Sequence, residues 1–345
     1  MRICLIGPIH GGLGTTGVNT FNEVLAKALS EMAHSVELGI PKQTFNLQAA
    51  ELSAKMTGLQ TFYLDGLIPG RAPQSFIKGI PLEQQLHRYD VIIVSGGGMD
   101  FGKILRASQG KRVLIWTHGM LGSPLNQWDG KEMLCPGVSY VCINKEHMQQ
   151  AHDLGLDSVA VPMSLPIPFH ERTVQCAGGF CAAVGNLEYR KNYTRVAEIV
   201  QCLGKKTKVY GVPLDSNVKQ IFEQNDCLEY CGTVPNETLL DNIAEADFLI
   251  HAATTEGRPV AVLEAMGLGV PVIVPDTPLY REFVDPNRNV LIDPNCPAGE
   301  QLAKVDLKAL CKIKNREALA AETHDKYGIE NFKNQLECLL DEELL

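Results

Sequence analysis

Apolar runs of strand length alternate with segments of helical periodicity along almost the whole chain. Amphipathic stretches such as residues 21–32 separate the runs, and this alternation is typical of βαβ units that share a parallel sheet. The runs form two series. The first comprises residues 3–6, 36–38, 91–94, 113–116 and 140–143, and the second comprises residues 180–184, 208–210, 227–230, 248–250 and 272–274. The pattern therefore predicts two parallel α/β domains.

A proline-rich segment separates the two series. Residues 161–168 contain three prolines, which remove backbone donors and favour extended geometry. A chain of 345 residues with 45% hydrophobic residues can bury two cores of ordinary size. We therefore predict an N-terminal domain over residues 1–165, a C-terminal domain over residues 166–325 and a terminal helix within residues 326–345.

Composition narrows the classes of partner and location. The formal net charge of −9 provides no general attraction to nucleic acid or anionic lipid. No apolar run is long enough to span a bilayer, and the first residues form a strand that enters a glycine loop rather than a signal peptide. The eleven cysteines lack the paired spacing of a zinc site, so most are expected to be reduced thiols. These features predict a cytoplasmic protein.

Two acidic residues, Glu256 and Glu264, bracket an almost wholly apolar segment. Burying a carboxylate there is costly unless a polar group meets it, which suggests that Glu264 binds a ligand. A strand over residues 247–250 and a small-residue loop come before, and Pro259 suits the first turn of a helix. A helix N-terminus at the carboxyl edge of a parallel sheet is where phosphate-bearing ligands bind. The alternative is an ordinary βαβ repeat whose first acidic residue interacts with the helix dipole.

A glycine loop near the N-terminus favours a competing interpretation. Residues 12–17 fit the pattern G-x-G-x-x-G, and Glu37 lies in the next strand at the spacing of a dinucleotide site. However, residues 7–11 intervene between the strand and this pattern, so the loop is too long for a tight dinucleotide turn. The glycines would equally let the backbone approach another ligand.

Several segments resemble the retaining glycosyltransferases of group 1, also called family 4. Residues 256–272 contain the family signature, which is a Glu, seven residues and then Glu-Ala-Met, followed by Gly-Val-Pro-Val. Residues 185–192 are similar to the family's Gly-Arg-Leu…Lys element, and residues 16–36 resemble its opening glycine loop, helix and strand. Glu282 and residues 289–294 match the block after the signature. The resemblance thus spans nearly the whole chain.

The resemblance implies the GT-B fold, an α/β fold in which two Rossmann-like domains, each a doubly wound parallel sheet, face each other across a cleft. The nucleotide-sugar donor would bind mainly to the C-terminal domain, and the acceptor mainly to the N-terminal domain. The terminal helix, within residues 327–345, would pack back on the N-terminal domain.

The resemblance also implies roles for individual residues. Glu256 would contact the sugar near the reacting carbon, Lys191 would neutralise the diphosphate, and His118, in a Thr-His-Gly segment, would face the donor sugar. These three are the candidate catalytic residues. Without the resemblance, His118 is as readily a structural histidine and Lys191 a solvated surface lysine. Glu264 would hold the donor ribose, and Gly17 would let its loop approach the phosphates.

The other candidate donor-binding residues lie in the same two segments. They are Gly185, Asn186, Arg190, Gly257, Arg258, Pro259 and Val260. Asn186 departs from the family, which usually has an arginine there, so one expected phosphate cation is absent. Arg190 and Arg258 are the two residues that could take its place.

Four further residues are candidates for the acceptor side. They are His10, Asn19, Ser95 and Gly97. Ser95 and Gly97 belong to a glycine-rich loop after a strand, which permits close approach of a ligand, and a mobile turn is the alternative.

These features together predict sugar transfer from a nucleotide-sugar donor to an acceptor hydroxyl. A UDP-sugar is favoured over a GDP- or ADP-sugar, and retention of anomeric configuration rests on the resemblance alone. Cations and helix N-termini suit the departing diphosphate, and no Asp-x-Asp motif is present, so neither a metal nor a further cofactor is expected.

The acceptor and the oligomeric state stay open. A soluble acceptor is favoured, whether a saccharide, a small metabolite or a modified nucleobase, and net charge disfavours nucleic acid. Three alternative functions remain: a sugar-nucleotide epimerase on the same scaffold, an NAD-dependent Rossmann enzyme, and a non-catalytic nucleotide-sugar binder.

Overall fold

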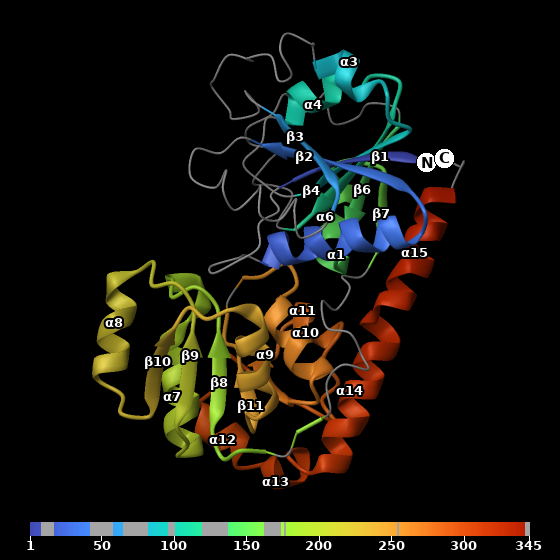
Figure 1. Cartoon of the computed structure of the whole chain (residues 1–345). Helices are drawn as coiled ribbons and strands as arrows, with labels where there is room; N and C mark the ends of the chain where they lie inside the picture. The colour runs from blue at the N-terminus through green and yellow to red at the C-terminus, as the bar shows by residue number, and fades with distance from the viewer. Residues whose placement is uncertain are drawn as a thin grey trace. The chain divides into compact units, whose positions relative to one another are not determined.

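The chain folds into two compact units in a computed structural model (Figure 1). One unit comprises residues 1–11, 15–164 and 330–345, and the other comprises residues 12–14 and 165–329. The structure describes residues 1–7, 17–41, 58–64, 82–95, 101–118, 137–161, 174–175, 177–253 and 255–341. The main division falls at 164/165, against the predicted 165/166, and the second falls at 329/330, against the predicted 325/326.

The first unit is built on a parallel sheet of seven described strands in the order β3-β2-β1-β4-β5-β6-β7. The strands are β1 (Arg2–Ile6), β2 (Ser35–Pro41), β3 (Gln60–Leu64), β4 (Val91–Ser95), β5 (Arg112–Thr117), β6 (Val138–Cys142) and β7 (Ser158–Ala160). The helices of this unit are α1 (Gly17–Glu31), α3 (Leu82–Leu86), α4 (Phe101–Ala107), α6 (Lys145–Asp153) and α15 (Ile329–Asp341). Every residue of β4 is buried, as expected for a central strand covered on both faces.

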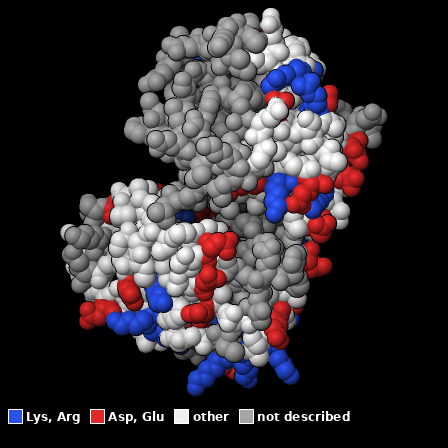
Figure 2. Space-filling view, in the orientation of Figure 1, with Lys and Arg blue, Asp and Glu red and all other residues white. Residues whose placement is uncertain are grey.

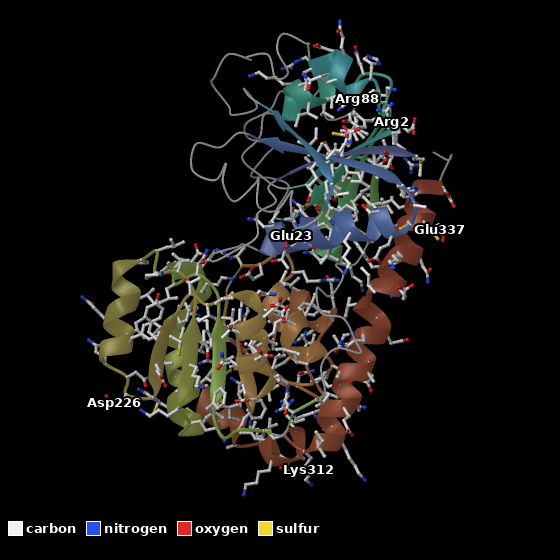
Figure 3. All side chains as sticks on the ribbon, in the orientation of Figure 1. Arg2, Glu23, Arg88, Asp226, Lys312 and Glu337 are labelled. Atoms are coloured by element: carbon white, nitrogen blue, oxygen red, sulfur yellow. The ribbon has the colours of Figure 1, made fainter. Side chains whose placement is uncertain are left out.

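Charged and polar side chains surround Glu37, which lies in β2. Glu37 in β2 accepts hydrogen bonds from Arg88 at 2.6 Å and from the Tyr89 hydroxyl at 2.8 Å, and Arg2 lies 3.8 Å away. Figure 3 labels Arg2 and Arg88 near each other in the first unit. Three residues that are distant from Glu37 in the sequence thereby surround its carboxylate. Their contacts fix the start of β2 against the rest of the sheet.

The C-terminal helix α15 packs on the first unit. Phe332 is buried, and its ring centroid lies 6.0 Å from that of Phe21 in α1 and 6.2 Å from that of Trp116 in β5. Arg112 donates hydrogen bonds to the carbonyl oxygens of Leu340 at 2.8 Å and Leu339 at 2.5 Å, and so satisfies carbonyls at the end of the helix. The last helix therefore completes the core of the N-terminal unit.

The second unit contains a parallel sheet of six described strands in the order β10-β9-β8-β11-β12-β13. The strands are β8 (Cys181–Val184), β9 (Thr207–Tyr210), β10 (Leu228–Gly232), β11 (Phe248–Ile250), β12 (Val272–Pro275) and β13 (Val290–Ile292). The helices are η3 (Tyr189–Lys191, 3-10), α7 (Tyr193–Leu203), α8 (Ser216–Glu223), α9 (Asn236–Ala244), α10 (Val260–Gly267), α11 (Pro278–Arg281), α12 (Ala298–Leu302), α13 (Leu307–Leu310) and α14 (Ile313–Tyr327). The prediction of two parallel α/β domains is confirmed.

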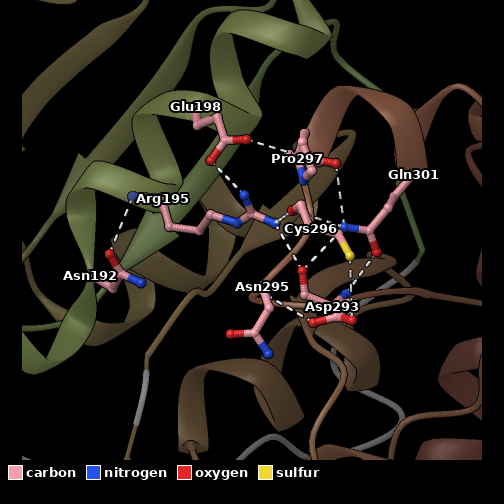
Figure 4. Close-up of polar contacts among 9 residues, drawn as sticks. Asn192, Arg195, Glu198, Asp293, Asn295, Cys296, Pro297 and Gln301 are labelled. Atoms are coloured by element: carbon pink, nitrogen blue, oxygen red, sulfur yellow. Dashed lines mark hydrogen bonds and ion pairs between the residues drawn. The ribbon is translucent and has the colours of Figure 1, made fainter.

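A polar network joins α7 to the segment after β13 (Figure 4). Arg195 donates to the carbonyl oxygens of Asp293 at 3.0 Å and Cys296 at 2.6 Å, and it pairs with Glu198 at 2.5 Å. Glu198 also accepts the backbone N–H of Ala298 at 2.8 Å, at the first residue of α12. This network fixes α7, which begins one residue after η3, the 3-10 helix that ends at Lys191.

The described surface carries charges of both signs. On the face drawn in Figure 2, acidic and basic side chains of the described residues are interspersed. Among the helices that the structure describes, each is too short or too polar to cross a lipid bilayer.

Candidate active site

Lys191, Arg190 and Glu256 meet at the carboxyl ends of two neighbouring strands of the second unit. Lys191 and Arg190 belong to η3, which follows β8, and Glu256 lies in the loop after β11. The strands β8 and β11 are hydrogen-bonded neighbours in the sheet. The Lys191 ammonium donates a hydrogen bond to Glu256 Oε1, and Arg190 Nη1 donates to the same oxygen at 3.0 Å. We call these three residues the carboxyl-edge cluster.

Within the carboxyl-edge cluster Lys191 and Glu256 are largely buried, Arg190 is exposed, and Glu256 stays charged. The exposed fractions of the Lys191 and Glu256 side chains are 13% and 12%. Burial alone would raise the pKa of Glu256, but the contact with His251 and the charge of Lys191 outweigh it and lower the pKa to about 2. His251 Nε2 lies 3.6 Å from Glu256 Oε1, and burial lowers the pKa of this histidine. Glu256 is therefore an ionised acceptor at neutral pH.

Gly185 makes room for the Lys191 side chain, and Gly211 makes room for the backbone of Gly185. A Cβ added at Gly185 would lie 3.2 Å from Lys191 Cε, and Gly185 has a φ of +145° that disfavours other residues. A Cβ at Gly211, which follows β9, would lie 1.9 Å from the carbonyl oxygen of Gly185. The Tyr193 hydroxyl donates to that same carbonyl at 3.0 Å. Gly211 was not among our candidates, although a glycine directly after a strand is a recognisable signal.

Glu264 lies within α10 and has no polar partner in the described part of the chain. The helix begins after Pro259, where no side chain caps it, and Glu264 is only 4% exposed. Burial raises the pKa of Glu264 to about 7. Val260 forms the first turn of the helix, and Gly257 lies partly exposed in the loop before it. A buried carboxyl group without a partner beside an uncapped helix N-terminus is suited to a ligand that bears hydroxyls and phosphates.

Arg190 and Arg258, the two arginines that could replace the missing family cation, lie in different surroundings. Arg190 lies at Glu256 and also pairs with Glu188 at 2.7 Å. The Arg258 side chain is 7% exposed and lies 3.7 Å from Glu282 Oε2. Its guanidinium also lies over the rings of Phe283 and Tyr327, at 5.3 Å and 5.7 Å from their centroids. Arg258 is therefore held by its own aromatic surroundings, whereas Arg190 stands beside Lys191.

Asn186 lies in the loop between β8 and η3 and is partly exposed. Its backbone carbonyl accepts the N–H of Glu188 at 3.0 Å, which shapes the turn that leads to Lys191. The turn ends at Asn192, which adopts the left-handed conformation at φ 52° and caps α7 by accepting the N–H of Arg195 at 3.3 Å.

His118 and Ser95 meet at the carboxyl ends of two neighbouring strands of the first unit. Ser95 ends β4 and His118 follows β5, and Ser95 Oγ lies 2.8 Å from His118 Nε2. Ser95 also donates a hydrogen bond to Asn22 Oδ1 in α1. Burial, with a smaller contribution from His147, lowers the pKa of His118 to about 3. His118 is therefore a neutral imidazole.

The acceptor-side candidates occupy different environments. Ser95 is fully buried and Asn19 is 3% exposed, so in this structure their side chains support the fold rather than line a surface. Gly17 is the exposed first residue of α1. His10 and Gly97 lie outside the described residues. Asn22 was not among our candidates, although a polar residue on the apolar face of a predicted helix could have identified it.

Part of the second unit is similar to a known protein family. Residues 179–323 match the family model described as Glycosyl transferases group 1. This match lies within the second unit. The match includes the carboxyl-edge cluster and Glu264, while the first unit lies outside it.

Two curated glycosyltransferases are similar to part of the chain. One is TuaC of Bacillus subtilis (strain 168), named as a teichuronic acid biosynthesis glycosyltransferase, with 30% identity over 111 residues, 32% of this chain and 28% of that protein. The other is O-antigen chain mannosyltransferase B of Escherichia coli, with 29% identity over 128 residues, 34% of this chain and 33% of that protein. The match therefore spans about a third of the length of these relatives.

Solved structures match the chain over nearly its whole length. The pneumococcal O-GlcNAc transferase GtfA, solved with UDP and GlcNAc, has a TM-score of 0.75 and 12% identity, with 99% of each chain covered. Anabaena Alr3699/HepE, solved with UDP and glucose, has a TM-score of 0.72 and 14% identity, with all of each chain covered. The GT-B fold predicted from the sequence is confirmed.

Proposed function

We propose that this protein transfers a sugar from a UDP-sugar to an acceptor hydroxyl with retention of anomeric configuration and without a metal ion. The carboxyl-edge cluster is the observation that carries the proposal, because it holds two cations and an ionised carboxylate beside an uncapped helix N-terminus. Breaking a sugar–phosphate bond places negative charge on the departing diphosphate and positive character on the anomeric carbon. The cluster supplies positive charge for the diphosphate and a negative charge for the anomeric carbon.

The donor diphosphate would replace Glu256 as the partner of Lys191 and Arg190. Both cations already converge on one oxygen, Glu256 Oε1, so a phosphate oxygen can occupy an equivalent position. Together with the N-terminus of α10 they supply the positive charge that a bound metal ion could otherwise provide. Displaced from the cations, Glu256 stays ionised and can accept a hydrogen bond from a sugar hydroxyl near the reacting carbon.

Glu264 would bind the donor ribose. Its buried carboxyl group has no protein partner in the described part of the chain, and two vicinal hydroxyls would supply the missing hydrogen bonds.

The choice of UDP and of retention is supported less directly. Two proteins with the same fold were solved with UDP, which favours the uracil nucleotide for this chain. For retention we prefer attack from the same face, assisted by the leaving phosphate, because we assign no residue as a covalent nucleophile. The acceptor in our proposal is a soluble saccharide or small metabolite, since α1 carries one lysine among two glutamates, and we propose a cytoplasmic location.

The proposal is tested by incubating the protein with UDP-, GDP- and ADP-sugars and measuring nucleotide release, with NAD in a parallel thermal-shift assay. We expect stabilisation by UDP and slow hydrolysis of a UDP-sugar, both reduced by Lys191→Met. Lys206→Met, which removes an exposed lysine whose ammonium donates to the carbonyl oxygen of Asp226, is the matched control. Binding without any turnover would indicate a nucleotide-sugar binder, a changed sugar on intact donor would indicate an epimerase, and stabilisation by NAD alone would contradict the proposal.

A further inference from the structure

A chain of hydrogen bonds links Asn22, Ser95 and His118 in the first unit. Ser95 Oγ donates to Asn22 Oδ1 and lies 2.8 Å from His118 Nε2. Asn22 Nδ2 donates to the backbone carbonyl of Ser95 at 3.4 Å. Asn22 and Ser95 are both fully buried, while the His118 ring is partly exposed. The three residues come from α1, the end of β4 and the end of β5, so the fold alone brings them together.

The protons in this chain can be placed by counting donors. Asn22 cannot be rotated by half a turn, because its oxygen would then face the carbonyl oxygen of Ser95. Asn22 Oδ1 therefore takes the single hydroxyl proton of Ser95. With that proton used, Ser95 Oγ can only accept from His118, so Nε2 must carry the imidazole proton.

We propose that Asn22 and Ser95 are positioning residues that hold His118 as the Nε2–H tautomer, which presents Nδ1 as a hydrogen-bond acceptor for a substrate hydroxyl. This inference rests on the proposed function for the identity of the substrate. His118 Nδ1 makes no hydrogen bond with the described residues, so its lone pair is available on a partly exposed ring. In this arrangement Ser95 and Asn22 act through His118 and do not contact substrate.

The surroundings leave the chain little freedom to rearrange. A Cβ added at Gly7 would lie 2.3 Å from the carbonyl oxygen of Ser95 and 2.7 Å from Asn22 Nδ2, so the residue directly after β1 packs against both residues. The His118 ring meets Phe21 edge-on, with centroids 4.9 Å apart and an interplanar angle of 68°. The imidazole is therefore fixed by a ring contact as well as by its hydrogen bond.

The tautomer is tested directly by ¹⁵N NMR of histidine-labelled protein, with the His118 signals identified by their loss in His118→Asn. We expect the Nε2–H pattern in the wild-type protein. In Asn22→Ala the Ser95 hydroxyl loses its acceptor and can donate to His118 Nε2, so we expect the Nδ1–H pattern. Asn22→Asp keeps an acceptor for Ser95 and should keep the Nε2–H tautomer. A wild-type Nδ1–H pattern, or an unchanged tautomer in Asn22→Ala, would overturn the proposal.

Kinetic measurements distinguish a positioning role of Asn22 from a purely structural one. We expect Asn22→Ala to lower kcat by about 10-fold, the size of one well-placed hydrogen bond, with a donor KM that changes little. His118→Asn places an amide at the position of Nδ1 and should retain more activity than His118→Gln, which places it at Nε2. Thr117→Val is the control, because it removes a buried hydroxyl that contacts Val141 and His147 one residue from His118.

The outcomes distinguish this inference from the proposed function. If the wild-type protein transfers sugar but His118→Gln is more active than His118→Asn, the role of Nδ1 is wrong and the function stands. If no nucleotide-sugar binds or reacts while the tautomer shifts as expected, the proposed function fails and the hydrogen-bond chain stands without its substrate role. Thermal unfolding of each variant shows whether a loss of activity is a loss of fold.

Discussion

Lys191 Nζ and Glu256 Oε1 are joined by a hydrogen bond across the carboxyl ends of β8 and β11, although the two residues lie 65 positions apart. In the free protein the lysine and the carboxylate satisfy each other. A bound diphosphate would take the lysine and release the carboxylate for the sugar. In this account the ion pair belongs to the protein without a donor. When the donor binds, Lys191 would contact its diphosphate and Glu256 would contact its sugar.

Glu256→Gln should separate binding from turnover. The substitution removes the charge that competes with phosphate for Lys191, so UDP should bind as tightly as to the wild-type protein or more tightly. Transfer should slow by about 100-fold, because the carboxylate no longer stabilises the cation-like sugar. Calorimetric titration with UDP and steady-state kinetics give the two quantities. Weaker binding together with unchanged kcat would show that Glu256 only organises the site.

Arg190→Ala and Arg258→Ala should have different effects. Removing Arg190 takes a cation from the phosphate position, and we expect about a 10-fold loss of UDP affinity. Removing Arg258 breaks an ion pair and two ring contacts, so we expect a free energy of unfolding lower by about 1–3 kcal/mol and little change in UDP affinity at a temperature where the variant is folded. Thermal melts and UDP titrations of the two variants make the comparison, and the reverse result would assign the missing family cation to Arg258.

Glu264 should make stability fall as pH rises. Its pKa is raised by burial from 4.5 to about 7, so between these values the folded protein binds more protons at this site than the unfolded chain does. The stabilisation is fully present below pH 4.5 and is lost as pH rises through 7, by up to about 1.4 kcal/mol per pH unit. Denaturant unfolding of Glu264→Gln across this range should lack that slope. A slope equal to that of the wild-type protein would place its origin elsewhere.

Glu264 also makes a separate prediction for ligand binding. A carboxylate that accepts ribose hydroxyls binds them best when ionised, so affinity for a UDP-sugar should rise between pH 5.5 and 8 in the wild-type protein. Glu264→Ala should bind weakly and independently of pH over this range. A UDP-sugar suits the measurement better than UDP because its diphosphate has no titrating group near neutral pH.

Gly211→Ala should disturb the site through the backbone. The new Cβ would lie 1.9 Å from the Gly185 carbonyl oxygen, so the strand-end loops must move apart and Lys191 must move with them. Gly232→Ala is the matched control, since Gly232 also has a positive φ of 76° but open space around its Cβ. We expect the control to cost about 1 kcal/mol of stability and Gly211→Ala to cost clearly more and to weaken UDP binding. Equal effects in unfolding and binding assays would contradict the packing role of Gly211.

The sequence was sufficient for the strands whose residues are buried on both faces. Residues 91–94 form an uninterrupted apolar run, so β4 was predicted almost to its boundaries. The strands β3, β7 and β13 were missed, and β7 is the clearest case, because no residue of Ser158–Ala160 is fully buried. The terminal helix was predicted within residues 327–345, and α15 spans Ile329–Asp341, with Gly328 separating it from α14, which ends at Tyr327. A Cβ at Gly328 would lie 2.3 Å from the carbonyl oxygen of His324, so this break needs a glycine.

The candidate site residues were also predictable only in part from the sequence. Glu256 and Glu264 were conspicuous because a carboxylate in an apolar segment is costly. Their different surroundings were not readable from the sequence, because Glu256 is paired by residues from a distant strand whereas Glu264 has no described partner. Ser95 was assigned to the acceptor side from its loop, but its buried hydroxyl lies against His118. Spacing along a chain predicts which strand end a residue occupies, and only the packed sheets show which side chains meet there.

Titration of UDP into Lys191→Met most directly tests the central claim that the carboxyl-edge cluster binds the donor diphosphate. Lys191→Met keeps the aliphatic stem that packs against Gly185 and removes the charge, and Lys206→Met controls for the loss of a lysine in the same unit. We expect Lys191→Met to bind UDP at least about 10-fold more weakly than the wild-type protein, with Lys206→Met unchanged. Wild-type affinity for UDP in a folded Lys191→Met protein would contradict the assignment.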